Sequence, residues 1–163
     1  MSETISNSAK TSSALYNNIK LHDLAETCGK DLLIQWGFKF SPFSENKNYR
    51  KFWEGKKERP DIVVEYKDKK AFINWNGKRR PVWLIDKHAV SSYEKWKDKL
   101  HYPLLVCFAI FDRNDYFQDI RFAVAGVHNY LPCKRKMRDA NEVVEFESDL
   151  PEFTKADVLN YLS

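Results

Sequence analysis

The stretch RPDIVVEYKDKKAFINWNGK, residues 59–78, consists of two apolar runs joined by a short polar link, which predicts a β-hairpin. With the turn centred on Asp68-Lys69, the predicted register places Asp61 opposite Asn76. Alternate residues of a strand share one face. The side chains of Asn74, Asn76 and Lys78 are therefore expected to project together, close to Asp61. The stretch thus predicts a small polar site at the start of one strand and along the next.

The segments around the hairpin predict a chain that mixes helices and strands. Apolar residues recur every three or four positions before Gly37, which predicts a helix from about Ile19 to Trp36. The apolar run Tyr102 to Phe111 predicts a strand buried on both faces. We further expect strands at 38–43, 82–85, 117–127 and 143–146, helices at 87–100 and from the cap Thr154 to Leu162, and a loop at 44–58. Residues 1–16 are expected to form a flexible leader, and residues 17–163 a single domain.

Composition indicates an ordinary soluble chain, because charged residues make up 31% of it and hydrophobic residues 43%. No apolar run approaches the length of a membrane span, and no apolar signal segment follows the N-terminus, so we expect a cytoplasmic protein without a membrane partner. The three cysteines are widely spaced, and Cys28 and Cys107 lie in apolar patterns, which predicts buried thiols in a reducing compartment.

Basic residues gather on both sides of the hairpin, although the net charge is only +4 because residues 142–152 are acidic. Such clustering around one element favours a phosphate-rich partner, and a solvated surface of mixed charge is the alternative. The residues expected to contact nucleic-acid phosphates are Lys56, Lys57, Arg59, Lys78, Arg79 and Arg80.

The predicted order of elements, with Pro60-Asp61 opening one strand and two same-facing polar residues on the next, resembles the PD-(D/E)XK nuclease superfamily. The resemblance spans about residues 21–127 and implies a restriction-endonuclease-like α/β fold. Its core would be α-β-β-β-α-β, a mixed central sheet flanked by helices, with a right-handed crossover from Val82 to Phe111. Asn74 and Asn76 stand where the family has an acid and a lysine.

The resemblance also implies a site and its partners. Glu26 matches an acid that many archaeal Holliday-junction resolvases carry on the first helix. The implied metal ligands are Glu26, Asp61 and Asn74, with Mg²⁺ or Mn²⁺ as cofactor if the protein is active, and the implied catalytic set adds Asn76 and Lys78. DNA would be the partner, and a homodimer is a further expectation, since many relatives cut two strands symmetrically.

Three functions remain open at this point. The first is a DNA-binding protein whose catalysis is impaired, either naturally or by engineering. The second is an active metal-dependent endonuclease in which Lys78 replaces the missing lysine, and the third is a protein-interaction module. If the scaffold is intact, Asn74→Asp with Asn76→Lys is expected to create magnesium-dependent cleavage. Alternatively, Asn76-Gly77 is a plain turn signal that ends the strand, and the asparagines have no catalytic ancestry.

Other catalytic patterns are missing from the sequence. There is no Gly-rich phosphate loop, zinc pattern or Ser-His-Asp order. The histidines are dispersed without ligand spacing, and the resemblance brings only His88 near the site. The four are His22, His88, His101 and His128.

Overall fold

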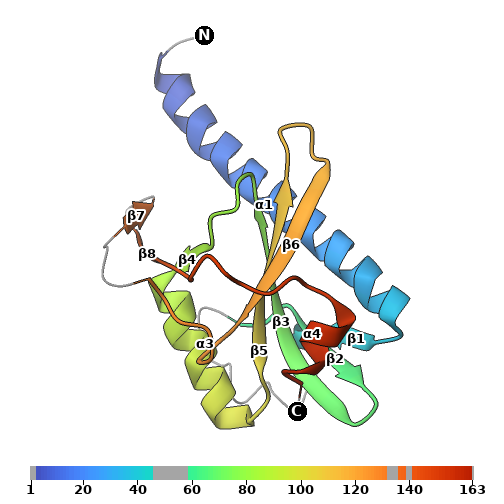
Figure 1. Ribbon diagram of the computed structural model, residues 1–163. Coiled ribbons are helices and arrows are strands. Elements are labelled where there is room, and N and C mark those ends of the chain that lie inside the picture. The colour runs from blue at the N-terminus through green and yellow to red at the C-terminus, as the bar shows by residue number, and fades with distance from the viewer. Residues whose placement is uncertain (1–2, 46–58, 132–135, 139–140, 163) are drawn as a thin grey trace.

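A five-stranded mixed sheet forms the centre of the protein, and a second, three-stranded sheet lies beside it (Figure 1). The computed structural model describes residues 3–45, 59–131, 136–138 and 141–162. The larger sheet has the order β1-β2-β3-β5-β6, formed by Lys39–Pro42, Ile62–Tyr66, Lys69–Lys78, Leu104–Phe111 and Phe117–Val124. The smaller sheet has the order β4-β8-β7, formed by Leu84–Asp86, Asn141–Glu145 and Lys136–Arg138. The helices are α1 (Glu3–Trp36), α3 (Lys87–Leu100), α4 (Lys155–Leu159) and the short 3-10 helix η1 (Phe43–Glu45).

The main sheet combines an antiparallel meander with one parallel pair. Strands β1, β2 and β3 are antiparallel neighbours, whereas β5 runs parallel to β3 and antiparallel to β6. A parallel pair requires a crossover connection, which here contains β4 and α3. We expected residues 82–85 to be the strand that opens this crossover. That expectation was wrong, because Leu84–Asp86 pairs with β8 in the smaller sheet and β3 itself opens the crossover.

Two apolar layers cover the two faces of the sheet. On one face, α1 packs through residues such as Ala25 and Leu33 against Ile73 and Trp75 of β3. On the other face, α3 and β4 pack against alternate residues of β3 and β5, namely Phe72, Val106 and Phe108. Strand β5 is buried along its whole length, which confirms the prediction of a strand covered on both faces.

Two glycines allow α1 to approach β3 closely. A Cβ on Gly77 would lie 2.1 Å from the carbonyl oxygen of Leu21, and a Cβ on Gly29 would lie 2.1 Å from the ring of Trp75. Neither position has room for a side chain. Gly77 is therefore a packing residue within a strand that continues to Lys78, and the interpretation of Asn76-Gly77 as a turn was wrong.

The hairpin between β2 and β3 forms as predicted, but with its register shifted by two residues. Tyr66 pairs with Lys69 and Val63 with Phe72, so that the two-residue loop is Lys67-Asp68, with Lys67 at φ +55°. A shift by one residue would have reversed every face, whereas a shift by two preserves them. Asp61 consequently lies beside residues 74 and 75 instead of Asn76.

The ends of the chain differ from the expected boundaries. Helix α1 begins at Glu3, within the segment expected to be a flexible leader, because extending an existing helix costs less than nucleating one. Its first turns extend beyond the sheet (Figure 1). Thr154 caps α4 as predicted, since its side chain accepts a hydrogen bond from the Asp157 N–H, but the helix ends at Leu159. No helix among the described residues is long and apolar enough to cross a membrane.

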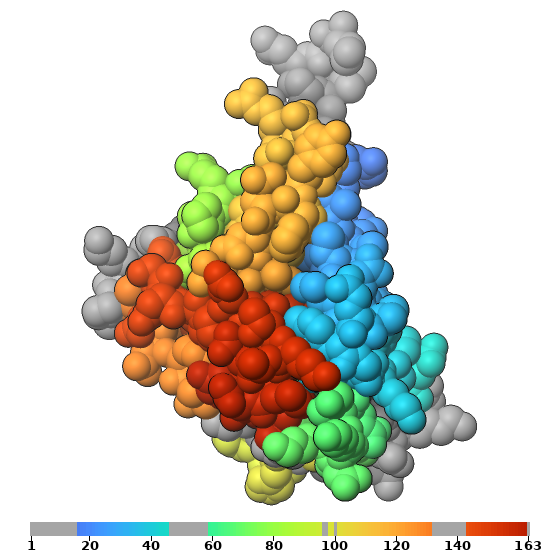
Figure 2. All heavy atoms as spheres, turned by 45° about the vertical axis from the view of Figure 1, so that its right-hand side comes forward, coloured from blue at the N-terminus to red at the C-terminus, as the bar shows by residue number. Residues whose placement is uncertain are grey.

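The segment before α4 closes one edge of the main sheet. The N–H of Phe122 donates to Pro151, and the N–H of Phe153 donates to Ile120, so this segment continues the sheet beyond β6. In Figure 2 the C-terminal residues, in red, lie on the surface below β6 and beside α1. Of the thiols expected to be buried, Cys107 is buried and Cys28 half-buried; Cys133 lies outside the described residues.

Candidate functional site

The candidate site lies where β2 begins and β3 continues past it. Strand β2 pairs with β3 only as far as Ile62, so the edge of β3 beyond Ile73 has no β2 neighbour. Asp61 covers the start of this edge, because its carboxylate Oδ2 accepts the Trp75 N–H at 2.7 Å. The backbone of Asp61 is fixed as well, since its N–H donates to Ile73 and its carbonyl accepts from Phe43. The strand ends therefore hold this carboxylate in one position.

The two asparagines of β3 extend the hydrogen-bond network from Asp61 along the strand. The Asn74 Nδ2 lies 3.4 Å from Asp61 Oδ2, and Asn76 Nδ2 donates to Asn74 Oδ1 at 2.8 Å. Asn76 Nδ2 also lies 3.3 Å from the carbonyl oxygen of Cys107 on β5. The structure thus brings together three of the predicted site residues, Asp61, Asn74 and Asn76.

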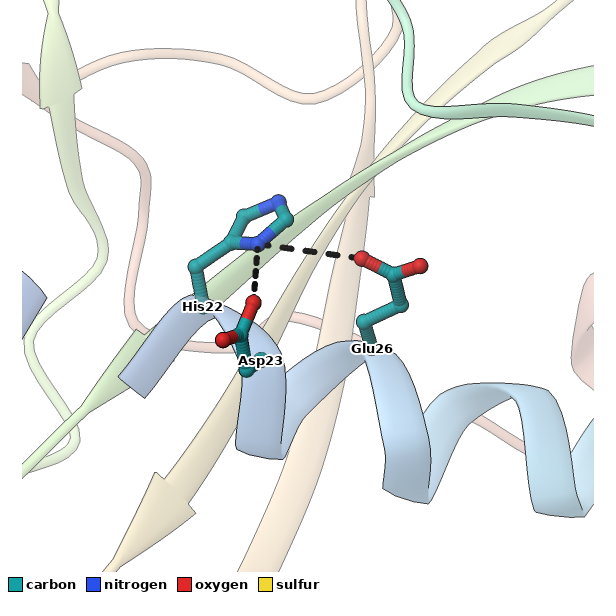
Figure 3. A group of neighbouring side chains, drawn as sticks. All are labelled: His22, Asp23 and Glu26. Carbon is teal, nitrogen blue, oxygen red and sulfur yellow. Dashed lines mark ion pairs between the residues drawn. The ribbon is translucent and has the colours of Figure 1, made fainter. Parts of the chain in front are cut away.

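Helix α1 contributes His22, a residue that the sequence analysis did not place in the site. Its Nε2 lies 3.3 Å from Asp61 Oδ1. On the other side of the ring, Nδ1 lies 3.6 Å from Asp23 and 3.7 Å from Glu26 (Figure 3). The hydrogen bond to Asp61 is the main reason that the pKa of His22 is raised to about 9, and it outweighs the partial burial that lowers this pKa. His22 is therefore an imidazolium at neutral pH.

Among the described residues, Glu26 is linked to Asp61 through His22. Its carboxylate contacts both Lys30, one turn further along α1, and the imidazole of His22. Within the described residues, the His, Cys, Asp and Glu donor atoms that lie within 4.8 Å of one another are those of His22, Asp23 and Glu26. Asp61 is not a member of this group. Of the predicted ligands, Glu26 and Asp61 contact opposite nitrogens of the His22 ring, Glu26 at Nδ1 and Asp61 at Nε2.

The oxygens of the predicted ligands also face hydrogen-bond donors. Asp61 Oδ1 faces His22, Asp61 Oδ2 accepts from Trp75, and Asn74 Oδ1 accepts from Asn76. A hard divalent cation requires several oxygens directed at one point, at least one or two of them charged and available. In this arrangement the residues do not fit a divalent cation.

A polar cavity of about 470 Å³ opens beside these residues, between α1, the edge of β3 and α3. Tyr93 and Ala89 of α3 contribute to its apolar wall, and Arg59 is exposed at the start of the hairpin. Its lining is Asn18, His22, Arg59, Asp61, Asn74, Trp75, Asn76, Ile85, Asp86, Ala89 and Tyr93. Because the lining includes both donors and acceptors, such as Arg59 and Asp86, the cavity suits a polar ligand with both kinds of group.

Three further predicted basic residues, Lys78, Arg79 and Arg80, do not line the cavity. Lys78 Nζ is 6.0 Å from the centre of the Phe108 ring. Arg79 donates to the carbonyl of Asp112 at 2.6 Å and to the carboxylate of Asp115 at 2.7 Å. Hydrogen bonds from Lys20 and Arg79 lower the pKa of Asp115. Through these contacts, this carboxylate in the turn after β5 is linked to α1 and to the residue that follows β3. Arg80 is exposed, and Lys56 and Lys57 lie outside the described residues.

His22 had one signal in the sequence that could have revealed it. It lies four residues before Glu26, and residues at this spacing are neighbours on a helix surface. Nothing in the sequence indicates that Asp61 meets the same ring. Comparison with protein-family models, curated proteins and solved structures finds no match. The function of the site is therefore argued from its geometry.

Proposed function

We propose that this chain is a DNA-binding protein on a PD-(D/E)XK nuclease-like scaffold that has lost hydrolytic activity. The order of α1, the meander β1-β2-β3, α3 and the parallel strand β5 supports this scaffold. This order is similar to the α-β-β-β-α-β core that the sequence resemblance implies, although β1 rather than residues 82–85 supplies one of the three strands. Fold alone does not determine function, so the argument depends on the site.

The observation that carries the proposal is the network of Asp61, Asn74 and Asn76. These residues meet at the strand edge, as the resemblance requires, but two of the three are neutral amides. Phosphodiester hydrolysis needs positive charge at the phosphate and an activated water, which a metal and a lysine commonly supply. Asn76 brings no charge, and the ammonium of Lys78 lies near Phe108 instead of in the cavity. The network therefore favours binding without cleavage.

The proposed contacts with DNA are made by the basic residues around the hairpin. Arg59 lines the cavity, and Arg80 is exposed just after β3. Arg79 is held by Asp112 and Asp115, so its main role would be to fix the turn beside them. Contacts of this kind go to phosphates, and they position DNA without reading its sequence.

Fluorescence anisotropy with a labelled duplex of arbitrary sequence tests the binding. Affinity should fall steeply between about 50 mM and about 200 mM salt, and each phosphate contact removed should reduce the salt slope by about 0.9. Arg80→Ala should weaken binding to unrelated duplexes equally. Lys39→Ala is the matched control, since Lys39 is exposed on β1, and it should bind as the wild type does. Absence of affinity at the lowest salt would reject DNA binding and favour the protein-interaction module.

A plasmid-nicking assay with Mg²⁺ or Mn²⁺ tests the loss of hydrolysis. The wild-type protein should leave supercoiled plasmid intact at concentrations that saturate binding. Nicking that requires the metal and disappears in Asp61→Ala would instead establish the active endonuclease.

A further inference from the structure

The imidazole of His22 lies among three carboxylates. Its two nitrogens face different groups. Nδ1 faces Asp23 and Glu26 (Figure 3), and Nε2 faces Asp61. Nε2 lies within hydrogen-bond distance of Asp61, whereas Nδ1 is within ion-pair range of Asp23 and Glu26. Carboxylates on both sides of a ring favour its charged form, so this geometry favours a positive charge between Glu26 and Asp61.

The same charge lies where the family resemblance implies a metal ion. The ring separates Glu26 from Asp61 and occupies Asp61 Oδ1, while the Trp75 N–H occupies Oδ2. A metal ion would have to displace both the ring and a backbone donor of a paired strand. It would also approach an existing cation, and like charges at such short range repel.

We propose that the side chain of His22 substitutes for a divalent metal ion, holding Asp61 and Glu26 with an organic cation and excluding Mg²⁺ and Mn²⁺ from the site. This substitution concerns the protein without its ligand and does not depend on DNA. Its consequence, that DNA binding needs no divalent cation, rests on the proposed function.

Electron paramagnetic resonance of Mn²⁺ measures binding to the protein directly, without DNA or any enzymatic readout. The wild-type protein should leave added Mn²⁺ in its free form. His22→Ala removes the ring and leaves Asp61, Asp23 and Glu26 beside an open space, so affinity should rise by about tenfold or more. His22→Ala with Asp61→Asn should lose that gain, which would locate the ion at Asp61.

Lys30→Ala is the matched control for the loss of a positive charge. Lys30 forms an ion pair with Glu26 from the same helix. Among the described residues, no hydrogen bond or ion pair joins Lys30 to Asp61. Its removal should leave Mn²⁺ binding unchanged. A gain equal to that of His22→Ala would show that any lost cation attracts the metal, and it would overturn the specific role of His22.

Two other results would overturn the proposal. The first is that the wild-type protein binds Mn²⁺ as tightly as His22→Ala does and that Asp61→Asn abolishes this binding. The other is a folded His22→Ala protein, verified by circular dichroism, that still does not bind the ion. If His22→Ala does not fold, His22→Gln provides the same test with nearly the original volume. DNA affinity that is the same in EDTA and in Mg²⁺ would support the consequence, and a failure of DNA binding would leave the Mn²⁺ result intact.

Discussion

The contact between His22 and Asp61 leads to a prediction that a double-mutant cycle can measure. The cycle combines His22→Gln and Asp61→Asn, which remove the charges and keep the approximate volumes. The paired atoms are 3.3 Å apart, and the side chains are 38% and 25% exposed. The quantity of interest is the coupling free energy of unfolding between the two positions.

The magnitude follows from the distance and the exposure. Two unit charges at this separation would interact by about 5 kcal/mol at an effective dielectric constant of about 20, and by about 1.3 kcal/mol in bulk water. Because His22 is partly exposed, the interaction should be close to the value for bulk water. Measured exposed ion pairs contribute about 0.2–1 kcal/mol to stability. We therefore expect a coupling free energy of about 1 kcal/mol at about pH 6.

The coupling should vanish at high pH. Because folding raises the pKa of His22 from 6.5 to about 9, the folded state binds the proton more tightly than the unfolded chain does. The contribution is complete below pH 6.5 and is lost as the pH rises through about 9. The cycle should consequently give a value near zero at about pH 10.

Urea unfolding of the four proteins, followed by circular dichroism, provides the free energies at both pH values. Global effects of alkaline pH cancel in the cycle. Titration of the His22 ring protons by NMR provides an independent measurement, with a midpoint raised above 6.5 in the wild type and a lower midpoint in Asp61→Asn. A wild-type midpoint near 6.5, or a coupling that does not change between the two pH values, would refute the argument.

Three further predictions concern stability and are measured by urea unfolding. Gly77→Ala should destabilise the protein by about 1–3 kcal/mol, because a Cβ would lie 2.1 Å from the backbone oxygen of Leu21; unchanged stability would show that α1 moves away without cost. Gly37→Ala should cost about 1–2 kcal/mol, because Gly37 has φ +82°, and Gly37→Asn should cost less. Thr154→Ala should cost about 1 kcal/mol through loss of the α4 cap, whereas Thr154→Ser should retain most of the stability.

The local pattern of the sequence predicted the elements and the facing residues of the hairpin. Alternation within residues 71–78 was enough to place Asn74 and Asn76 on one side, because strand periodicity is a property of the backbone. The register was predicted incorrectly because the loop Lys67-Asp68 lacks a turn signal such as Asn-Gly, and Lys67 adopts a positive φ that its side chain does not favour.

Contacts between distant segments could not be predicted in the same way. The pairing of β4 depends on β8, which lies more than fifty residues later in the chain, and an apolar run does not indicate its partner. The approach of α1 to β3 depends on Gly29 and Gly77, and neither glycine indicates in the sequence which segment it will contact. His22 enters the site through that approach.

The side chains of His22, Asn74 and Asn76 together give the site a consistent balance of charge. A family-like site would have an acid at position 74 and a lysine at position 76, with a metal balancing the acids. With Asn74 neutral, the site has one carboxylate fewer, so that a single imidazolium can satisfy Asp61 and Glu26. Asn76 then needs no charge, and its amide donates to Asn74. A change at one position alone should therefore disturb the balance.

This balance modifies the expected result of introducing the acid-x-Lys motif of the proposed family. Asn74→Asp with Asn76→Lys introduces the acid and the lysine, but His22 would still occupy Asp61 Oδ1. We expect this double variant to leave plasmid intact in Mg²⁺, and the addition of His22→Ala to produce magnesium-dependent nicking. Asp61→Asn in the triple variant is the control and should abolish the nicking. Cleavage by the double variant at the same rate as the triple variant would show that His22 does not obstruct the metal, and the two proteins should be compared at equal DNA affinity.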